Sequence, residues 1–400
     1  MLPPWRAVFR MHETSNQQVK GVQKTSDAMQ ETSRPEPPAL LIFDSKRGVP
    51  DRAPPIASSK EILMSDYTKA FRAAVVQAEP VWNDVEGGID KTIAFATEAA
   101  AGGADVVAFP EVWIPGYPWF LWLDSVAWQS QFVVPYVNNS IEVGSSQFAR
   151  IEKAARDAGI AISLGFSERE NGSLYISQAF IDKHGVTSTV RRKLKPTHVE
   201  RTMFGEGDGS DIQVIDTELG RVGALNCWEH LQPLAKYAMY SQNEQLHVAA
   251  WPSFSIFEGA VNALGPEVNV GAARQYAVEG QCFVLSPTGL VGDAAQALVT
   301  DTDLKKQFLA LGGGHARIFG PDGRDLATPL SPTEEGLLYA DIDYTAILAA
   351  KNAADPVGHY SRPDVFRLYF DNTRKSRVVN RPLAPSAAPS DSELAQILQG

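Results

Sequence analysis

The chain has 400 residues, of which 44% are hydrophobic, and a formal net charge of −11 at pH 7. A chain of this length and composition can bury a large core, as one large domain or two smaller ones. The acidic balance excludes the basic stripe of a nucleic-acid-binding surface and favours small-molecule or protein partners.

Residues 1–68 are rich in proline, serine, glutamine and charged residues, which break any helical or strand period. This composition predicts a disordered N-terminal extension. Met64 stands just before the first expected strand and is a candidate for the natural start of the protein. The N-terminus lacks the continuous apolar segment of a signal peptide, and no stretch approaches the roughly 18 apolar residues of a membrane span, so no membrane partner is expected.

Strand and helix patterns alternate from residue 69 to residue 350, which predicts α/β layers of mixed sheet. Residues 174–181 and 186–194 alternate around Asp182-Lys-His-Gly185, the pattern of a hairpin. The other expected strands cover residues 73–78, 104–109, 160–166, 222–225 and 247–250, and the expected helices lie around 89–100, 148–155, 233–242 and 268–278.

Residues 351–400 form a polar segment that nevertheless contains an apolar cluster. Because this cluster lies beyond the core units, we expect it to pack on a partner subunit, so that the segment supports oligomerisation. Residues 382–389 are expected to be a flexible linker within the tail. The members of the cluster are Tyr360, Val365, Phe366, Leu368, Tyr369 and Phe370.

The chain has two cysteines, Cys227 and Cys282. So few cysteines argue against a disulfide scaffold and predict a reducing compartment, namely the cytoplasm. Cys282 lies in an apparent buried strand and is assigned a structural role. Cys227 lies between a short apolar strand and a helix, where parallel α/β sheets bind ligands and where helix amides favour the thiolate. Taken alone, this stretch fits a buried structural cysteine equally well.

Glu111 and Lys193, like Cys227, stand at the ends of apolar strands, so the three side chains are expected to converge. A thiol is mostly protonated at neutral pH, so it needs a base to take its proton or a cation to stabilise the thiolate. Glu111 and Lys193 supply these two functions. Taken singly, Glu111 also fits a surface carboxylate, and Lys193 also fits a member of the solvated basic run 191–195.

Three motifs, in this order, resemble the nitrilase superfamily: Phe109-Pro-Glu111, Arg192-Lys193-Leu-Lys-Pro-Thr-His-Val-Glu200-Arg and Asn226-Cys227-Trp-Glu-His230. They look like its nitrilase branch, similar to bacterial aliphatic and arylacetonitrile nitrilases. The resemblance covers about residues 70–343 and implies a four-layer αββα sandwich whose catalytic domain is residues 69–350. It also implies homo-oligomers, from dimers to spiral assemblies.

By this resemblance Cys227 is the nucleophile, Glu111 the general base, Lys193 the cation beside the tetrahedral intermediate and Glu200 an additional active-site glutamate. The implied reaction converts a nitrile and water to a carboxylic acid and ammonia through a thioimidate and an acyl-enzyme, with no metal or cofactor. The alternatives are a cyanide hydratase or dihydratase, an amidase or carbamoylase, a non-catalytic scaffold, and a thiol redox sensor that would need Cys282 as resolving cysteine.

Aromatic and polar residues near these motifs are candidates to line a substrate pocket, which favours organic nitriles over cyanide. His198 and His230 lack a Cys-His hydrolase motif and the spacing of zinc ligands, so both are expected to be satisfied supporting side chains. Trp119 and Trp122 are expected to pack in the core. The pocket candidates are Trp113, Tyr117, Trp228, His230 and Ser253.

Overall fold

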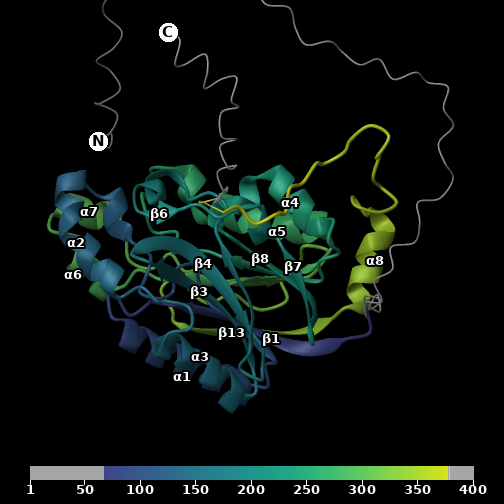
Figure 1. Ribbon diagram of the computed structural model, residues 1–400, viewed down its shortest axis with the longest axis horizontal. Helices are drawn as coiled ribbons and strands as arrows, with labels where there is room; N and C mark the ends of the chain where they lie inside the picture. Colours follow the sequence, from purple (N-terminus) through teal and green to yellow (C-terminus); the bar gives the residue numbers. More distant parts are fainter. Residues whose placement is uncertain (1–66, 377, 379–400) are drawn as a thin grey trace, which may run out of the picture. The chain divides into compact units, whose positions relative to one another are not determined.

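Two β-sheets run through the part of the chain that the computed structural model describes, residues 67–376 and residue 378 (Figure 1). The expectations for residues 1–66 and 379–400 lie outside the described residues. The first sheet has the order β11-β1-β2-β3-β4-β5, with β13 also paired to β1 and β6 to β4. Its strands are β1 (Ala70–Ala78), β2 (Val106–Ala108), β3 (Ala161–Glu170), β4 (Ser173–Ile181), β5 (Thr187–Arg192), β6 (Phe204–Gly205), β11 (Thr288–Gly289) and β13 (Gly336–Asp343).

The second sheet has the order β12-β10-β9-β8-β7. Strands β8, β9 and β10 are parallel neighbours, as β1, β2 and β3 are in the first sheet. Parallel strands covered on both faces are apolar throughout, which is why they were recognisable in the sequence. The strands of this sheet are β7 (Val214–Thr217), β8 (Gly220–Asn226), β9 (Leu246–Ala250), β10 (Phe283–Ser286) and β12 (Arg317–Phe319).

The outer layer on the first sheet consists of α1 (Val85–Ala101) and α3 (Ser146–Ala158). Asp84 caps α1 by accepting a hydrogen bond from the Gly87 amide, and α3 ends at Gly159, whose φ of 66° is the left-handed cap that glycine adopts at low cost. Their apolar faces, including Ile89 and Phe148, join one buried cluster with strand residues such as Val107.

The outer layer on the second sheet consists of α4 (Pro233–Tyr240) and α5 (Pro266–Gly280), where Met239 and Tyr276 pack with Leu225 of β8. A further cluster fills the space between the two sheets, with Val75 of β1 facing Val222 of β8. Figure 1 shows α1 and α3 on one side of the paired sheets and α4 and α5 on the other. The expected αββα sandwich is therefore confirmed.

The end of the layers beside α1 carries helices that the sequence patterns did not predict. Helix α2 leaves Val126, Val133 and Val134 exposed and contains Pro135, so its apolar residues do not follow a helical period. Three of these helices pack against the aromatic loop after Glu111, which itself contains the fourth and in which Trp119 is buried and Trp122 is partly buried, as expected. They are η2 (Trp119–Trp122), α2 (Val126–Asn138), α6 (Asp293–Val299) and α7 (Asp303–Phe308).

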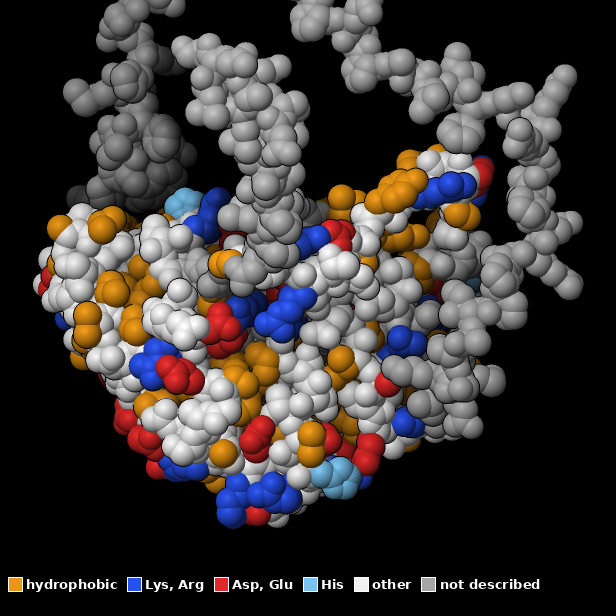
Figure 2. Space-filling view, in the orientation of Figure 1, with side chains coloured by type: hydrophobic (Ala, Val, Ile, Leu, Met, Phe, Trp, Pro, Cys, Tyr) orange, Lys and Arg blue, Asp and Glu red, His pale blue; other side chains and the backbone are white. Residues whose placement is uncertain are grey.

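The chain leaves the sandwich after α8 (Thr345–Ala353) as a segment without helix or strand. Tyr360, Phe366 and Tyr369 of this segment are 70%, 79% and 91% exposed. Figure 2 shows hydrophobic side chains where Figure 1 draws the loop after α8. Packing of this cluster on a partner subunit remains a prediction. Among the described residues, no helix has the length and apolar character to span a bilayer.

Candidate active site

Cys227 stands where β8 ends and the short 3-10 helix η5 (Cys227–Leu231) begins. Its φ is +49°, a left-handed conformation that a side chain with a Cβ adopts only under constraint. The residue is 8% exposed. The strand-to-helix position expected from the sequence is therefore confirmed, with a backbone that the neighbouring groups must hold in place.

Lys193 follows β5 and bridges two glutamates. Its Nζ lies 2.8 Å from Glu111 Oε1 and 2.8 Å from Glu200 Oε2, and none of these three residues is more than 1% exposed. An ammonium group has three N–H donors, so one remains without a partner among the described residues. The two catalytic candidates Glu111 and Lys193 thus converge as the sequence predicted.

The two glutamates have different surroundings. Glu200 accepts hydrogen bonds from Lys193, from the Thr197 amide at 2.6 Å and from the Tyr117 hydroxyl at 2.6 Å, so both of its oxygens are occupied. Glu111 accepts one hydrogen bond, through Oε1, and its Oε2 is buried without a partner among the described residues. Glu111 therefore keeps a free oxygen that can take a proton.

Attraction between Lys193 and the two glutamates offsets the cost of burying their charges. Burial alone would lower the pKa of Lys193, but the carboxylates of Glu111 and Glu200 outweigh it and raise the pKa well above its ordinary value. Burial raises the pKa of Glu111 to about 8, with Lys193 opposing and Glu200 adding to the rise. Lys193 thus stays an ammonium, and Glu111 is a stronger base than an exposed glutamate.

The Cys227 thiol is protonated at rest. Burial raises its pKa well above the ordinary value and the Glu111 charge adds to the rise, while Lys193 and the Trp228 amide lower it. The Trp228 amide favours the thiolate, as expected of helix amides, but burial and the two neighbouring carboxylates outweigh it and keep the pKa high. A nucleophile in this position has to lose its proton to a base as it attacks.

Glu229 links the segments that carry Lys193 and Cys227, a role that the sequence reasoning missed. Arg191 of β5 makes two hydrogen bonds to its carboxylate, of 2.7 and 2.9 Å. The same carboxylate accepts from the Leu194 amide at 2.8 Å and from the Asn226 amide at 2.8 Å. The alternative interpretation of residues 191–195 as a solvated run does not hold for Arg191, which is buried. The alternation of the strand, which turns it inward, was the available signal.

Known proteins of one family resemble this chain over most of its length. The carbon-nitrogen hydrolase family matches residues 72–352. A nitrilase of Pseudomonas syringae pv. syringae is 58% identical over 80% of this chain and 95% of its own length. An aliphatic nitrilase of Rhodococcus rhodochrous is 53% identical over 80% and 88%, respectively. The chain belongs to the carbon-nitrogen hydrolase family, in its nitrilase branch.

A third relative and a solved structure extend the comparison. The arylacetone-specific nitrilase of Alcaligenes faecalis is 47% identical over 80% of this carbon-nitrogen hydrolase and 91% of its own length. An amidase of Nesterenkonia sp. AN1, solved with its active-site cysteine modified, has a TM-score of 0.53 and 19% identity. It covers 71% of this chain and 97% of that one, and at this identity it shows the shared fold alone.

Two expected pocket residues of this hydrolase lie beside the site. Tyr117, 5% exposed, donates to Glu200 and accepts a hydrogen bond of 3.2 Å from the Trp122 indole. Trp228 follows Cys227 directly, is partly buried, and donates from its indole to Asn269 of α5 at 2.9 Å. Their polar groups are thereby fixed, and the Tyr117 ring also packs against Trp119 with ring centroids 4.5 Å apart.

The other three expected pocket residues point elsewhere. The Trp113 indole donates to Thr92 of α1 and packs in the core under the first sheet, because β2 and the following turn direct it there. His230 has both ring nitrogens engaged, with the Cys227 carbonyl and with His247. The Ser253 hydroxyl lies 2.8 Å from the Gly312 carbonyl and holds that loop. These contacts give each of the three a structural partner, and their place in the substrate pocket stays a prediction.

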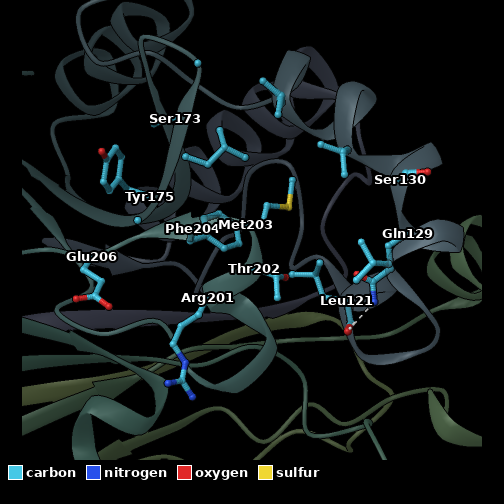
Figure 3. Close-up of a pocket in the computed structure, with 16 residues that line it drawn as sticks. Leu121, Gln129, Ser130, Ser173, Tyr175, Arg201, Thr202, Met203, Phe204 and Glu206 are labelled. Carbon is cyan, nitrogen blue, oxygen red and sulfur yellow. Dashed lines mark hydrogen bonds between the residues drawn. The ribbon is translucent and has the colours of Figure 1, made fainter.

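A groove of about 740 Å³ opens on the surface next to the buried site. It lies between α2, β4 and the segment Arg201–Phe204, which follows Glu200 directly. Figure 3 shows Met203 and Phe204 between Gln129 of α2 and Tyr175 of β4. Since Glu200 faces inward and Arg201 outward, η3 (His198–Thr202) separates this groove from the buried carboxylates. In the described residues, no group of three or more His, Cys, Asp or Glu is arranged as a metal site.

Proposed function

We propose that this chain hydrolyses an organic nitrile to the carboxylic acid and ammonia, with Cys227 as nucleophile, Glu111 as general base and Lys193 as stabilising cation. The observation that carries the proposal is the ion-pair cluster in which Lys193 bridges Glu111 and Glu200 while one oxygen of Glu111 remains free. Nitrilase relatives at 47–58% identity support it.

In the first step, Glu111 takes the Cys227 proton as the sulfur attacks the nitrile carbon. A carbon–sulfur bond forms, one π bond of the nitrile breaks, and the nitrogen receives the proton, which gives a thioimidate. The third N–H donor of Lys193 is available for the charge that develops on the substrate. Both oxygens of Glu200 are hydrogen-bonded, and its role in this proposal is to hold Lys193.

In the second stage, Glu111 removes a proton from a water molecule that adds to the thioimidate carbon. Ammonia leaves with the transferred protons, and an acyl-enzyme remains on Cys227. A second water, activated in the same way, releases the carboxylic acid and restores the thiol. Two waters are consumed for each nitrile. If the tetrahedral intermediate expels the thiol before ammonia, the product is an amide instead.

The rings of Tyr117 and Trp228 form apolar walls of the substrate site in this proposal. Both rings have their polar atoms bonded to protein groups, so they offer apolar surface to a substrate and suit a carbon substituent. This favours organic nitriles over cyanide, the smallest substrate of the class.

An amidase is the second candidate, because the same cysteine, lysine and glutamate residues can attack an amide carbonyl. The shared fold with the Nesterenkonia amidase keeps this alternative open. A homo-oligomer is also part of the proposal, supported by the exposed aromatic residues after α8. A cytoplasmic location is supported by the two free cysteines.

Ammonia release from matched pairs of substrates tests the proposal. Aliphatic, aromatic and arylacetonitriles are compared with their corresponding amides and with cyanide. We expect turnover of organic nitriles to exceed that of the amides and of cyanide. Faster release from the amides would assign the chain as an amidase, and release from cyanide alone would assign it as a cyanide hydrolase.

A further inference from the structure

A chain of four hydrogen bonds leads from the backbone of Cys227 into the core. The Cys227 carbonyl accepts from His230 Nδ1 at 2.7 Å, and His230 Nε2 lies 2.9 Å from His247 Nε2. His247 Nδ1 lies 2.7 Å from Glu244 Oε1, and the Tyr276 hydroxyl donates to Glu244 Oε2 at 2.6 Å. No residue of this set from His230 to Tyr276 is more than 2% exposed.

The carbonyl at one end and the neutral state of the two rings together determine the direction of each bond. A carbonyl can only accept, so His230 Nδ1 carries a hydrogen. Burial lowers the pKa of both His230 and His247 well below the ordinary value, so each ring is neutral and carries a single N–H. His230 Nε2 therefore accepts from His247, and His247 Nδ1 must accept from Glu244. A carboxylate has no hydrogen to donate.

We propose that Glu244 is a positioning residue that acts as a buried carboxylic acid, donating its proton to His247 so that the chain holds the Cys227 carbonyl and aims the thiol at Glu111. Through this chain the left-handed backbone of the nucleophile is held by a hydrogen bond that water cannot reach. The role of the chain in catalysis rests on the proposed function of Cys227.

The surroundings of Glu244 support the neutral form. Burial raises its pKa to about 8, opposed only by the Tyr276 hydrogen bond. The titratable groups that face it are Tyr276 of α5, His247 of β9, Tyr240 of α4, Cys282 before β10 and Tyr344 before α8, and none of these is a lysine or an arginine.

Glu229, also buried, offers the contrast. Arg191 outweighs burial and lowers the pKa of Glu229 below its ordinary value. The two glutamates that brace Cys227 thus differ in protonation because only one of them has a cationic partner.

Substitutions at Glu244 can test whether this residue acts as a neutral hydrogen-bond donor to His247. Glutamine can donate to His247 and accept from Tyr276, whereas leucine of similar size can do neither. We expect Glu244→Gln to retain kcat within about threefold, and Glu244→Leu to lower kcat by about tenfold or more with KM changed less than about twofold. Thermal unfolding and circular dichroism report whether each variant folds. Equal losses in both folded variants, or no loss in folded Glu244→Leu, would overturn the proposal.

An infrared titration tests the protonation state without activity. Near neutral pH the wild-type protein should show stronger protonated-carboxyl absorption than Glu244→Gln, which retains the contribution of Glu111, and this difference should fade as pH rises through about 8. If the two proteins have the same spectrum near neutral pH, Glu244 is ionised and the proposal fails. If the wild type hydrolyses no nitrile, the proposed function fails, while the infrared result still decides the state of Glu244.

Discussion

Lys193 Nζ lies 2.8 Å from Glu111 Oε1, and both side chains are withdrawn from solvent. Such a pair is stable in the interior only when the remaining donors and acceptors also find partners. Glu200 supplies the second acceptor for Lys193, and Tyr117 and the Thr197 amide complete Glu200. The carboxylate oxygen without a hydrogen bond is Glu111 Oε2, and this oxygen can accept a proton from the thiol.

Replacing the nucleophile should abolish turnover while the fold remains. We expect Cys227→Ala to reduce ammonia release by at least about a thousandfold, since the covalent route is lost. Cys282→Ala is the matched control, because Cys282 is also a free buried cysteine but lies in the core beside α5. It should retain catalysis at some cost in stability. Equal ammonia release from wild type and Cys227→Ala would refute the assignment.

Removing Lys193 should abolish turnover and also destabilise the fold. Lys193→Ala leaves two carboxylates buried without their cation, and breaking a buried pair in this way typically costs about 3–5 kcal/mol unless a proton replaces it. Urea unfolding and ammonia release measure the two effects. Lys195→Ala, two residues along and exposed beside Glu206, should change neither. A Lys193→Ala protein that kept most of its activity would contradict the charge-stabilising role.

The pH dependence of kcat/KM should reflect Glu111. As base it must be ionised, and burial raises its pKa to about 8, so activity should rise with pH through about 8 and not near 4.5. Glu200 contributes to that rise in pKa, so the residual activity of Glu200→Gln should have its midpoint at lower pH. An unshifted midpoint in that variant would mean that another group controls the acid limb.

The Glu229 carboxylate should matter for both stability and rate. Glu229→Gln leaves Arg191 buried without a countercharge and weakens the acceptor that holds the amides of Leu194 and Asn226. We expect a loss of about 3–5 kcal/mol in unfolding free energy and a lower kcat. Glu206→Gln, an exposed glutamate, serves as control. If Glu229→Gln is as stable as wild type, the hydrogen bonds of Glu229 to Arg191, Leu194 and Asn226 do not contribute to folding stability.

The exposed aromatic residues after α8 should control assembly. Phe366→Ser combined with Tyr369→Ser removes apolar surface but leaves the hydrogen bond from the Lys375 amide to Asp208 that anchors the end of this segment. Light scattering should report a smaller particle than wild type. Val186→Ser, which removes an exposed apolar side chain from the β4–β5 turn, should leave the size unchanged. If the Phe366→Ser/Tyr369→Ser protein forms particles as large as those of wild type and of Val186→Ser, this segment does not contribute to the subunit interface.

The layers of the fold could be predicted from the sequence because their signals are local. Buried parallel strands are continuous apolar runs, and α1 and α3 have a helical period and glycines near their ends. Helix α2 was not predicted, because its apolar residues face several directions, including solvent. Its position is set by packing against the aromatic loop, and such long-range packing leaves no period in the sequence.

The chemical types at the site also followed from the sequence, since Glu111, Lys193 and Cys227 all stand at strand ends. The structure places Glu111 and Lys193 after strands of the first sheet and Cys227 after a strand of the second. The directions in which side chains point did not follow. Trp113, two residues after Glu111, bonds to a partner from α1, and His230 bonds through one nitrogen to the Cys227 carbonyl and through the other to His247 of β9. Proximity along the chain says which residues are near the site. Only the tertiary structure decides which hydrogen bonds each can make, and therefore which carboxyl group keeps its proton.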